Sequence, residues 1–230
     1  MKVEIWSDIV CPFCYIGKRR FEQALQKFPH ADKVEVVWRS FELNPNYQPV
    51  PGRNTYESLA NNKGVSLAQA REMTNHVTTV AKEVGLRYDF DRAVPTNTFL
   101  GHQLIHLAAK HGQQDAAKER LMAAYYTEGQ NLNEIDTLVN LAAEVGLDAE
   151  EARTALTTGA YAEAVRYDEY QAQQINVRGV PFFVFEDKYA VSGAQPTELF
   201  AEVLEKVWDE FRPAPVLLTD GPACGPEGCD

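Results

Sequence analysis

Two cysteines, Cys11 and Cys14, lie three positions apart at the point where an apolar segment gives way to an amphipathic one. Residues 3–6 have the composition of a short strand, and residues 14–28 carry apolar side chains at helical spacing. Residues 34–38 are rich in β-branched side chains and predict a second strand. This strand–helix–strand order favours a parallel sheet. Two thiols so spaced at the start of a helix can close into a disulfide and reopen, or supply half of a zinc site.

The four cysteines of the chain form two close pairs, Cys11 with Cys14 and Cys224 with Cys229, and no cysteine lies in the 209 residues between the pairs. This clustering indicates redox chemistry or metal binding rather than a framework of structural disulfides. No signal peptide and no run of 18 apolar residues is present, so we expect a cytoplasmic protein. The net charge of −11 argues against nucleic acid or an anionic membrane as partner.

The middle of the chain predicts a long helical region after a proline-rich loop at residues 44–54. Ser66 and Gln69 have the spacing of a capping box. Asp115 is expected to cap a helix that reaches residue 127, and Lys18, Arg19 and Arg20 are expected on a solvated face. The expected helices cover residues 66–84, 97–111, 115–127, 136–145, 148–158 and 160–175.

Strand character returns at residues 182–185 and 189–191, on either side of a short turn. A helix over residues 196–211 follows, and we expect its apolar stripe to consist of Leu199, Val203, Val207 and Phe211. The sheet therefore begins in the first forty residues and ends after residue 182. A helical region lies between its two parts.

The segment from Ser7 to Gly17, Ser-Asp-Ile-Val-Cys-Pro-Phe-Cys-Tyr-Ile-Gly, together with Asn97-Thr98 and Gly179-Val180-Pro181, resembles the FrnE-like branch of the DsbA family. This branch is similar to 2-hydroxychromene-2-carboxylate isomerases and kappa-class glutathione transferases. The resemblance covers residues 1–211 and implies an α/β thioredoxin fold with a large inserted α-helical subdomain. Residues 1–54 and 176–211 would form the thioredoxin-like domain, residues 55–175 the insertion, and residues 212–230 a flexible tail.

Cys11 is the expected nucleophile, because the free backbone N–H groups and the dipole at a helix start favour a thiolate. Cys14, one turn further and more buried, would resolve the mixed disulfide. The expected activity is thiol–disulfide exchange on protein disulfides, as oxidase, reductase or isomerase. A redox potential between about −270 mV and about −120 mV is expected, because Phe13 replaces the histidine of strongly oxidising relatives.

The resemblance implies a cis bond between Val180 and Pro181, opposite the cysteines. The backbone beside a cis proline can pair with an extended substrate segment, so Val180, Pro12 and Phe13 are expected to contact substrate. A trans proline at the start of a strand is the alternative.

Asp8 is a candidate proton relay to Cys14, or an aspartate in a solvated turn. Asn97 and His102 are candidates for lining the cleft. The spacing of His102 and His106 also suits a metal, but a histidine pair without metal is favoured, because no third ligand lies nearby.

The tail pair Cys224 and Cys229 is expected to relay electrons to Cys11 and Cys14. The alternatives are a tail disulfide that is incidental or regulates access, and a zinc site that joins all four cysteines. Expected partners are protein thiols or disulfides and a small thiol or thioredoxin-type reductant. No cofactor besides the redox disulfide is expected, with glutathione as a candidate co-substrate, and the chain is expected to be a monomer.

Two further functions remain open on the sequence alone. Glutathione-dependent isomerisation or conjugation could use the same cleft, although relatives with that chemistry commonly have serine at the position of Cys11. A zinc-binding or redox-sensing module is the alternative that is not an enzyme.

Overall fold

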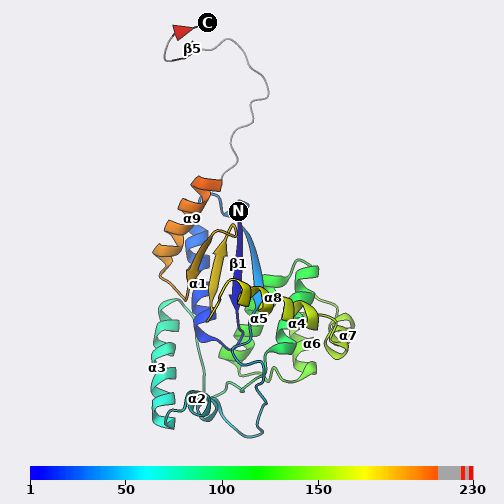
Figure 1. Ribbon diagram of the computed structural model, residues 1–230. Helices are drawn as coiled ribbons and strands as arrows, with labels where there is room; N and C mark the ends of the chain where they lie inside the picture. The colour runs from blue at the N-terminus through cyan, green and yellow to red at the C-terminus, as the bar shows by residue number, and fades with distance from the viewer. Residues whose placement is uncertain (212–223, 226–227, 230) are drawn as a thin grey trace.

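The computed structural model describes residues 1–211, 224–225 and 228–229, and its centre is a four-stranded sheet (Figure 1). The strands are β1 (Lys2–Ser7), β2 (Glu35–Ser40), β3 (Phe182–Phe185) and β4 (Tyr189–Ser192), in the spatial order β2-β1-β3-β4. Strand β1 runs parallel to β2 and antiparallel to β3, with Ile5 opposite both Trp38 and Phe183. A separate short ladder pairs β5 (Cys224–Gly225) with β6 (Gly228–Cys229).

The alternation of side chains along β1 divides the sheet into two buried faces. Val3 and Ile5 join the main core on one face, which α1 (Pro12–Lys27) and α9 (Thr197–Phe211) cover. Trp6 lies on the other face with Ala172 of α8 (Ala162–Gln174). The sheet is therefore the middle layer between helices.

The helices between β2 and β3 form a group around α4 (Phe99–Lys110), which contacts α5, α6, α7 and α8. A hairpin of α2 and α3 lies to one side and contacts α1 through α3. Capping boxes start α2 at Asn54 and α3 at Ser66, the latter as the sequence predicts. The remaining bounds are η1 (Ala31–Lys33), α2 (Thr55–Lys63), α3 (Leu67–Glu83), α5 (Gln114–Ala123), the π-helical η2 (Ala124–Glu128), α6 (Ile135–Glu144) and α7 (Ala149–Thr158).

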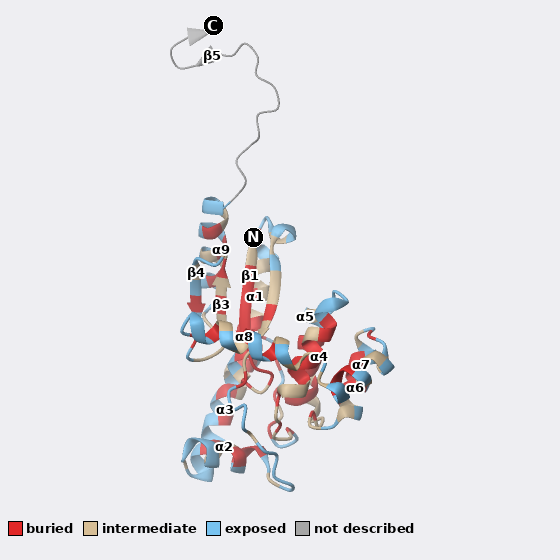
Figure 2. Ribbon diagram, turned by 45° about the vertical axis from the view of Figure 1, so that its right-hand side comes forward, coloured by how far each residue is buried: buried red, intermediate tan, exposed pale blue. Residues whose placement is uncertain are grey.

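The sheet and the helical group share one hydrophobic core. Ile5 and Phe183 of the sheet belong to the same buried cluster as Leu104 of α4, Leu121 of α5 and Leu138 of α6. Figure 2 shows buried residues along the strands and on the helices beside them. The predicted α/β thioredoxin fold with an inserted helical region is therefore observed. Helices α2 to α8 all lie within residues 55–175, and the exact domain boundaries stay a prediction.

Three local predictions are wrong. Lys18 is not solvated: it is buried and pairs with Glu22, Asp115 and Glu119. Asp115 lies in the first turn of α5 and does not cap it, since the N-cap position is Gln113.

The apolar stripe of α9 is also wrong in part. Val207 is buried and Val203 packs against the core, as predicted, but Leu199 and Phe211 are exposed, and Phe200 and Leu204 are buried instead. The helix carries apolar residues on two adjacent rows, and only packing against α1 decides which row is covered. Among the described residues, no helix is long and apolar enough to cross a bilayer.

Candidate active site

Cys11 occupies the N-cap position of α1, and Pro12 follows it as the first helical residue. Proline suits this position because its fixed φ is helical and the first N–H groups of a helix have no partner within the helix. The N–H of Cys14 donates to the carbonyl of Cys11 at 3.0 Å. Both thiols are free; Cys11 keeps 5% of its surface exposed and Cys14 none. Cys14 is therefore the more buried of the two, as the sequence reasoning expects, and the roles of nucleophile and resolving thiol stay predictions.

The bond between Val180 and Pro181 is cis, as the resemblance implies. The Cys11 thiol lies 3.4 Å from the carbonyl oxygen of Val180, so the chain before Pro181 borders the sulfur directly. Gly17 of α1 makes this approach possible: a Cβ there would lie 2.9 Å from Cγ of Pro181.

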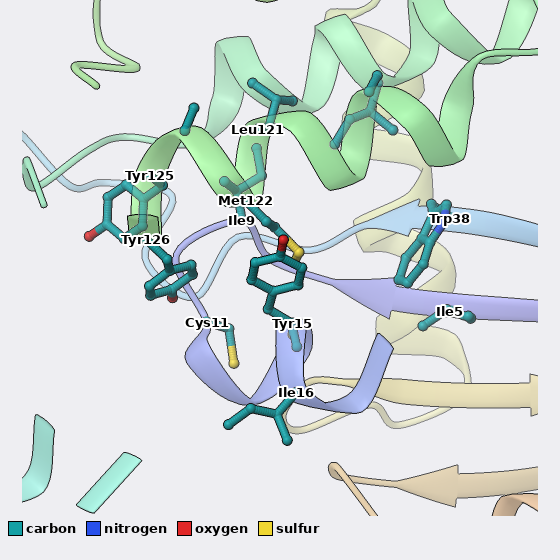
Figure 3. Packing of buried hydrophobic residues seen from close by; sticks show 14 of the residues in the cluster. Ile5, Ile9, Cys11, Tyr15, Ile16, Trp38, Leu121, Met122, Tyr125 and Tyr126 are labelled. Atoms are coloured by element: carbon teal, nitrogen blue, oxygen red, sulfur yellow. The ribbon is translucent and has the colours of Figure 1, made fainter. Parts of the chain in front are cut away.

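Aromatic residues close the site on the side of the insertion. The Tyr88 hydroxyl donates to the carbonyl of Pro12 at 2.7 Å, and its ring stacks on Tyr126 with centroids 4.3 Å apart. Figure 3 shows Tyr126 and Tyr15 near Cys11, and Leu121 of α5 above them in the view. Phe13, in contrast, exposes 42% of its surface and is an apolar side chain two residues after Cys11 in the sequence.

Cys14 lies in a buried and largely apolar environment that opposes its ionisation. Burial raises the pKa of the Cys14 thiol well above its ordinary value, and the neighbouring Cys11 thiol adds to this increase. The positive charge of Lys118 and the hydroxyl of Ser7 act in the opposite direction.

Lys118 of α5 is a site residue that the sequence analysis missed. Its side chain is 1% exposed, and its ammonium donates to the carbonyl oxygen of Ser7 at 3.1 Å. Burial lowers its pKa to about 8, although the nearby Cys14, Asp8 and Cys11 favour the charged form. Nothing in the local sequence marks this lysine, because it lies more than a hundred residues from the cysteines.

Asp8 forms a buried pair with His102. His102 Nε2 lies 3.2 Å from Asp8 Oδ1, and the Leu43 N–H donates to Oδ2 at 2.8 Å. Burial opposes ionisation of Asp8, but these hydrogen bonds outweigh it and hold its pKa below the usual value; burial lowers the pKa of His102. Asp8 is therefore a buried carboxylate rather than an aspartate in a solvated turn. The ring of His102 is buried too and does not line an open cleft. A proton relay through Asp8 stays a prediction.

Asn97 and His106 serve other parts of the structure. The Asn97 amide donates to the Tyr47 carbonyl at 3.0 Å, and its Oδ1 accepts from the Phe99 N–H, so it ties the loop of residues 44–54 to the start of α4. His106 contacts Asp168 at 3.0 Å. Among the described residues, no three His, Cys, Asp or Glu side chains are grouped as ligands for a metal.

The side chains of Cys224 and Cys229 lie outside the described residues, so the predicted relay and the four-cysteine zinc site stay untested. The backbone ladder places Cys224 opposite Cys229. Helix α9 begins next to the site, where Thr197 contacts Gln23 of α1, and ends at Phe211 beside Lys188 in the turn between β3 and β4. The helix therefore leads away from Pro181.

Comparison with known proteins agrees with this architecture. A family model described as a DSBA-like thioredoxin domain matches residues 2–205. A probable DsbA oxidoreductase from Streptomyces coelicolor is 43% identical, with a TM-score of 0.86 over 100% of this chain and 98% of that one. The match confirms the fold class expected from the sequence.

Two further relatives extend the comparison. The uncharacterized protein YwbO of Bacillus subtilis is 29% identical over 204 residues, which are 88% of this chain and 94% of YwbO. The cytosolic disulfide reductase DsbM of Pseudomonas aeruginosa, in a structure with GSH, shares the fold with a TM-score of 0.63 and 19% identity, over 90% of this chain and 98% of that one.

Proposed function

This chain belongs to the DsbA-like thioredoxin domain family, and we propose that it exchanges thiols and disulfides with protein substrates through Cys11 and Cys14. The observation that carries the proposal is the position of Cys11. Its thiol stands at the N-terminus of α1, 3.4 Å from the backbone carbonyl before Pro181, with Cys14 buried one turn below.

In the oxidising direction, a substrate thiolate attacks the Cys11–Cys14 disulfide at Cys11 and releases Cys14. A second substrate thiolate then attacks the substrate sulfur of the mixed disulfide and leaves both protein thiols reduced. In the reducing direction, the Cys11 thiolate attacks a substrate disulfide and expels one substrate thiolate. The Cys14 thiolate then attacks Cys11, and the second substrate thiolate departs.

Residues around Cys11 provide the contacts for an extended substrate segment. The backbone at Val180 borders the sulfur, and the exposed ring of Phe13 lies next to it in sequence. Such a segment can pair with the backbone beside Pro181 and place an apolar side chain on Phe13. The carbonyl of Pro12 is bound to Tyr88 of the insertion, and its ring is a further candidate for contact with substrate.

We place the activity in the cytoplasm, because all four cysteines stand in two close pairs and none is left to cross-link distant elements. A small thiol such as glutathione, or a thioredoxin-type protein, would then supply electrons. In the tail, residues opposite each other in an antiparallel ladder have Cα atoms about 4.5–5.5 Å apart, a separation that a disulfide can span. An exchange of electrons between the tail pair and Cys11 remains part of the proposal.

A glutathione redox titration followed by tryptophan fluorescence tests the proposal. We expect one two-electron transition, retained in the C224S/C229S variant and lost in Cys11→Ser. Reduction of insulin disulfides by the wild type, but not by Cys11→Ser, would establish the protein substrate class. No transition in the wild type would exclude the oxidoreductase, and zinc analysis and glutathione-conjugation assays would then test the two alternatives.

A further inference from the structure

Two buried lysines lie beside the Trp38 ring, and only one of them is neutralised. Lys18 forms ion pairs with three carboxylates, whereas Lys118 forms none within the described part of the chain. Their ammonium groups lie 5.8 Å and 5.6 Å from the ring centroid of Trp38. A fully buried cation without an ion pair is costly, so its retention calls for a functional reason.

Cys14 is a buried thiol whose ionisation requires a nearby positive charge. To resolve a mixed disulfide it must become a thiolate, and its surroundings resist this because they are dry. The charge of Lys118 lowers the pKa of Cys14, against the effect of burial, and the hydrogen bond to the Ser7 carbonyl fixes the position of its ammonium. The two groups come from different parts of the fold, Cys14 from α1 and Lys118 from the insertion.

We propose that the ammonium of Lys118 is the counter-charge that stabilises the Cys14 thiolate in the step that resolves the mixed disulfide. The proposal rests on the function proposed above for the two cysteines. In this step Cys14 gives up its proton to solvent, and its thiolate attacks the Cys11 sulfur. The bond between Cys11 and the substrate sulfur breaks, and the substrate leaves as a thiolate. In the opposite direction, the same charge stabilises Cys14 as the leaving thiolate.

The other ionisable groups around the thiols and Lys118 do not supply this charge. The groups that face them are Asp8, Cys11, Lys18, Tyr88, His102 and Tyr126. Lys18 is already paired, and burial lowers the pKa of His102 and so favours its neutral form. Burial raises the pKa of both tyrosines, so they remain neutral near pH 7. Because the pKa of Lys118 is about 8, this lysine carries its charge at neutral pH.

The test separates the two thiol steps in the full-length chain. In a C224S/C229S background, the reduced protein is mixed with 5,5′-dithiobis(2-nitrobenzoic acid) at pH values from 6 to 10. Attack by Cys11 releases one thionitrobenzoate, and resolution by Cys14 releases the second, so a stopped-flow trace has two phases. Cys14→Ser identifies the second phase by removing it.

Lys118→Met should slow the second phase about tenfold at pH 7.5, and the difference from the parent should shrink as the pH rises above 8, where Lys118 loses its proton. The thiolate fraction falls tenfold for each unit by which the pKa increases, but a more basic thiolate is a better nucleophile and recovers part of the rate. Lys18→Met is the matched control, since it removes a buried ammonium that is already paired. It should change the second phase much less.

Lys118→Arg keeps the charge and should restore most of the lost rate. Circular dichroism confirms that each variant is folded. A second phase with the same rate and pH profile in Lys118→Met as in the parent would overturn the proposal, and so would a folded arginine variant as slow as the methionine variant. If the parent protein gave neither phase, the proposed function itself would fail, which is a different outcome from a failure of the role of Lys118.

Discussion

The Tyr88 hydroxyl donates a 2.7 Å hydrogen bond to the carbonyl oxygen of Pro12, so the helical insertion holds the residue that directly follows Cys11. Tyr126 stacks on the same ring, and its own buried hydroxyl has no hydrogen-bond partner among the described residues. The two tyrosines therefore differ in what their hydroxyl groups contribute.

Tyr88→Phe should lower the free energy of unfolding by about 1 kcal/mol, the usual net value of one hydrogen bond. Tyr126→Phe should be neutral or slightly stabilising, because it removes a buried hydroxyl that bonds to nothing. Urea denaturation of both variants under reducing conditions makes the comparison. Equal losses would show that the bond to Pro12 contributes nothing.

Gly17→Ala should weaken the active site even though alanine is the better helix former. The new methyl group would lie 2.9 Å from Cγ of Pro181 and push the proline away from α1. Overpacking of this kind costs about 1–3 kcal/mol. Gly179→Ala is the control, because a methyl group there meets open space. Thermal unfolding and the rate of insulin reduction should both fall for Gly17→Ala and stay near wild type for Gly179→Ala.

Lys118→Met should stabilise the protein at neutral pH and lose this advantage in alkali. The pKa of Lys118 falls from 10.5 to about 8 on burial, so between these values the unfolded chain binds more protons than the folded one. The stability of the wild type therefore rises with pH across this window, relative to the variant, by up to about 3 kcal/mol. Urea denaturation at pH 7 and pH 10.5 gives the difference. A stability difference that did not change with pH would contradict the burial of a charged lysine.

Asp8→Asn should change the acid limb of the stability profile. The folded pKa of Asp8 lies below its unfolded value of about 3.9, so its carboxylate stabilises the fold above that pH and loses this effect as the pH falls through the folded value. At pH 7 the variant should be about 1–3 kcal/mol less stable, as expected when charged hydrogen bonds are lost. The difference should shrink as the pH falls below about 4. Urea midpoints at closely spaced pH values provide the measurement.

Local signals in the sequence were sufficient for most of the fold. The spacing of Cys11 and Cys14 before an amphipathic segment, and the capping box at Ser66, depend only on residues a few positions apart. The cis bond at Pro181 came from the family resemblance rather than from any local pattern.

The environment of a side chain could not be predicted where it depends on residues far away in the sequence. Lys18 precedes two arginines, and this basic run predicts a surface charge. In the structure Lys18 is buried and forms ion pairs with Asp115 and Glu119 of α5. Lys118 has no local marker, because its environment depends on a contact with Ser7 at the end of β1. The spacing of Leu199 predicts a core position, but α1 packs on the adjacent row of α9. In each case a tertiary contact decides the environment of the residue.

The shared core of the sheet and the insertion limits how this protein can be simplified. Leu104 and Leu121 pack in one cluster with Ile5 and Phe183, so excision of residues 55–175 would expose apolar side chains of the sheet. It would also remove both groups that the insertion brings to the two thiols, Tyr88 and Lys118. For protein engineering, the sheet and the insertion should therefore be transplanted together, because a thioredoxin core cut from this chain would lack the contacts that Tyr88 and Lys118 make.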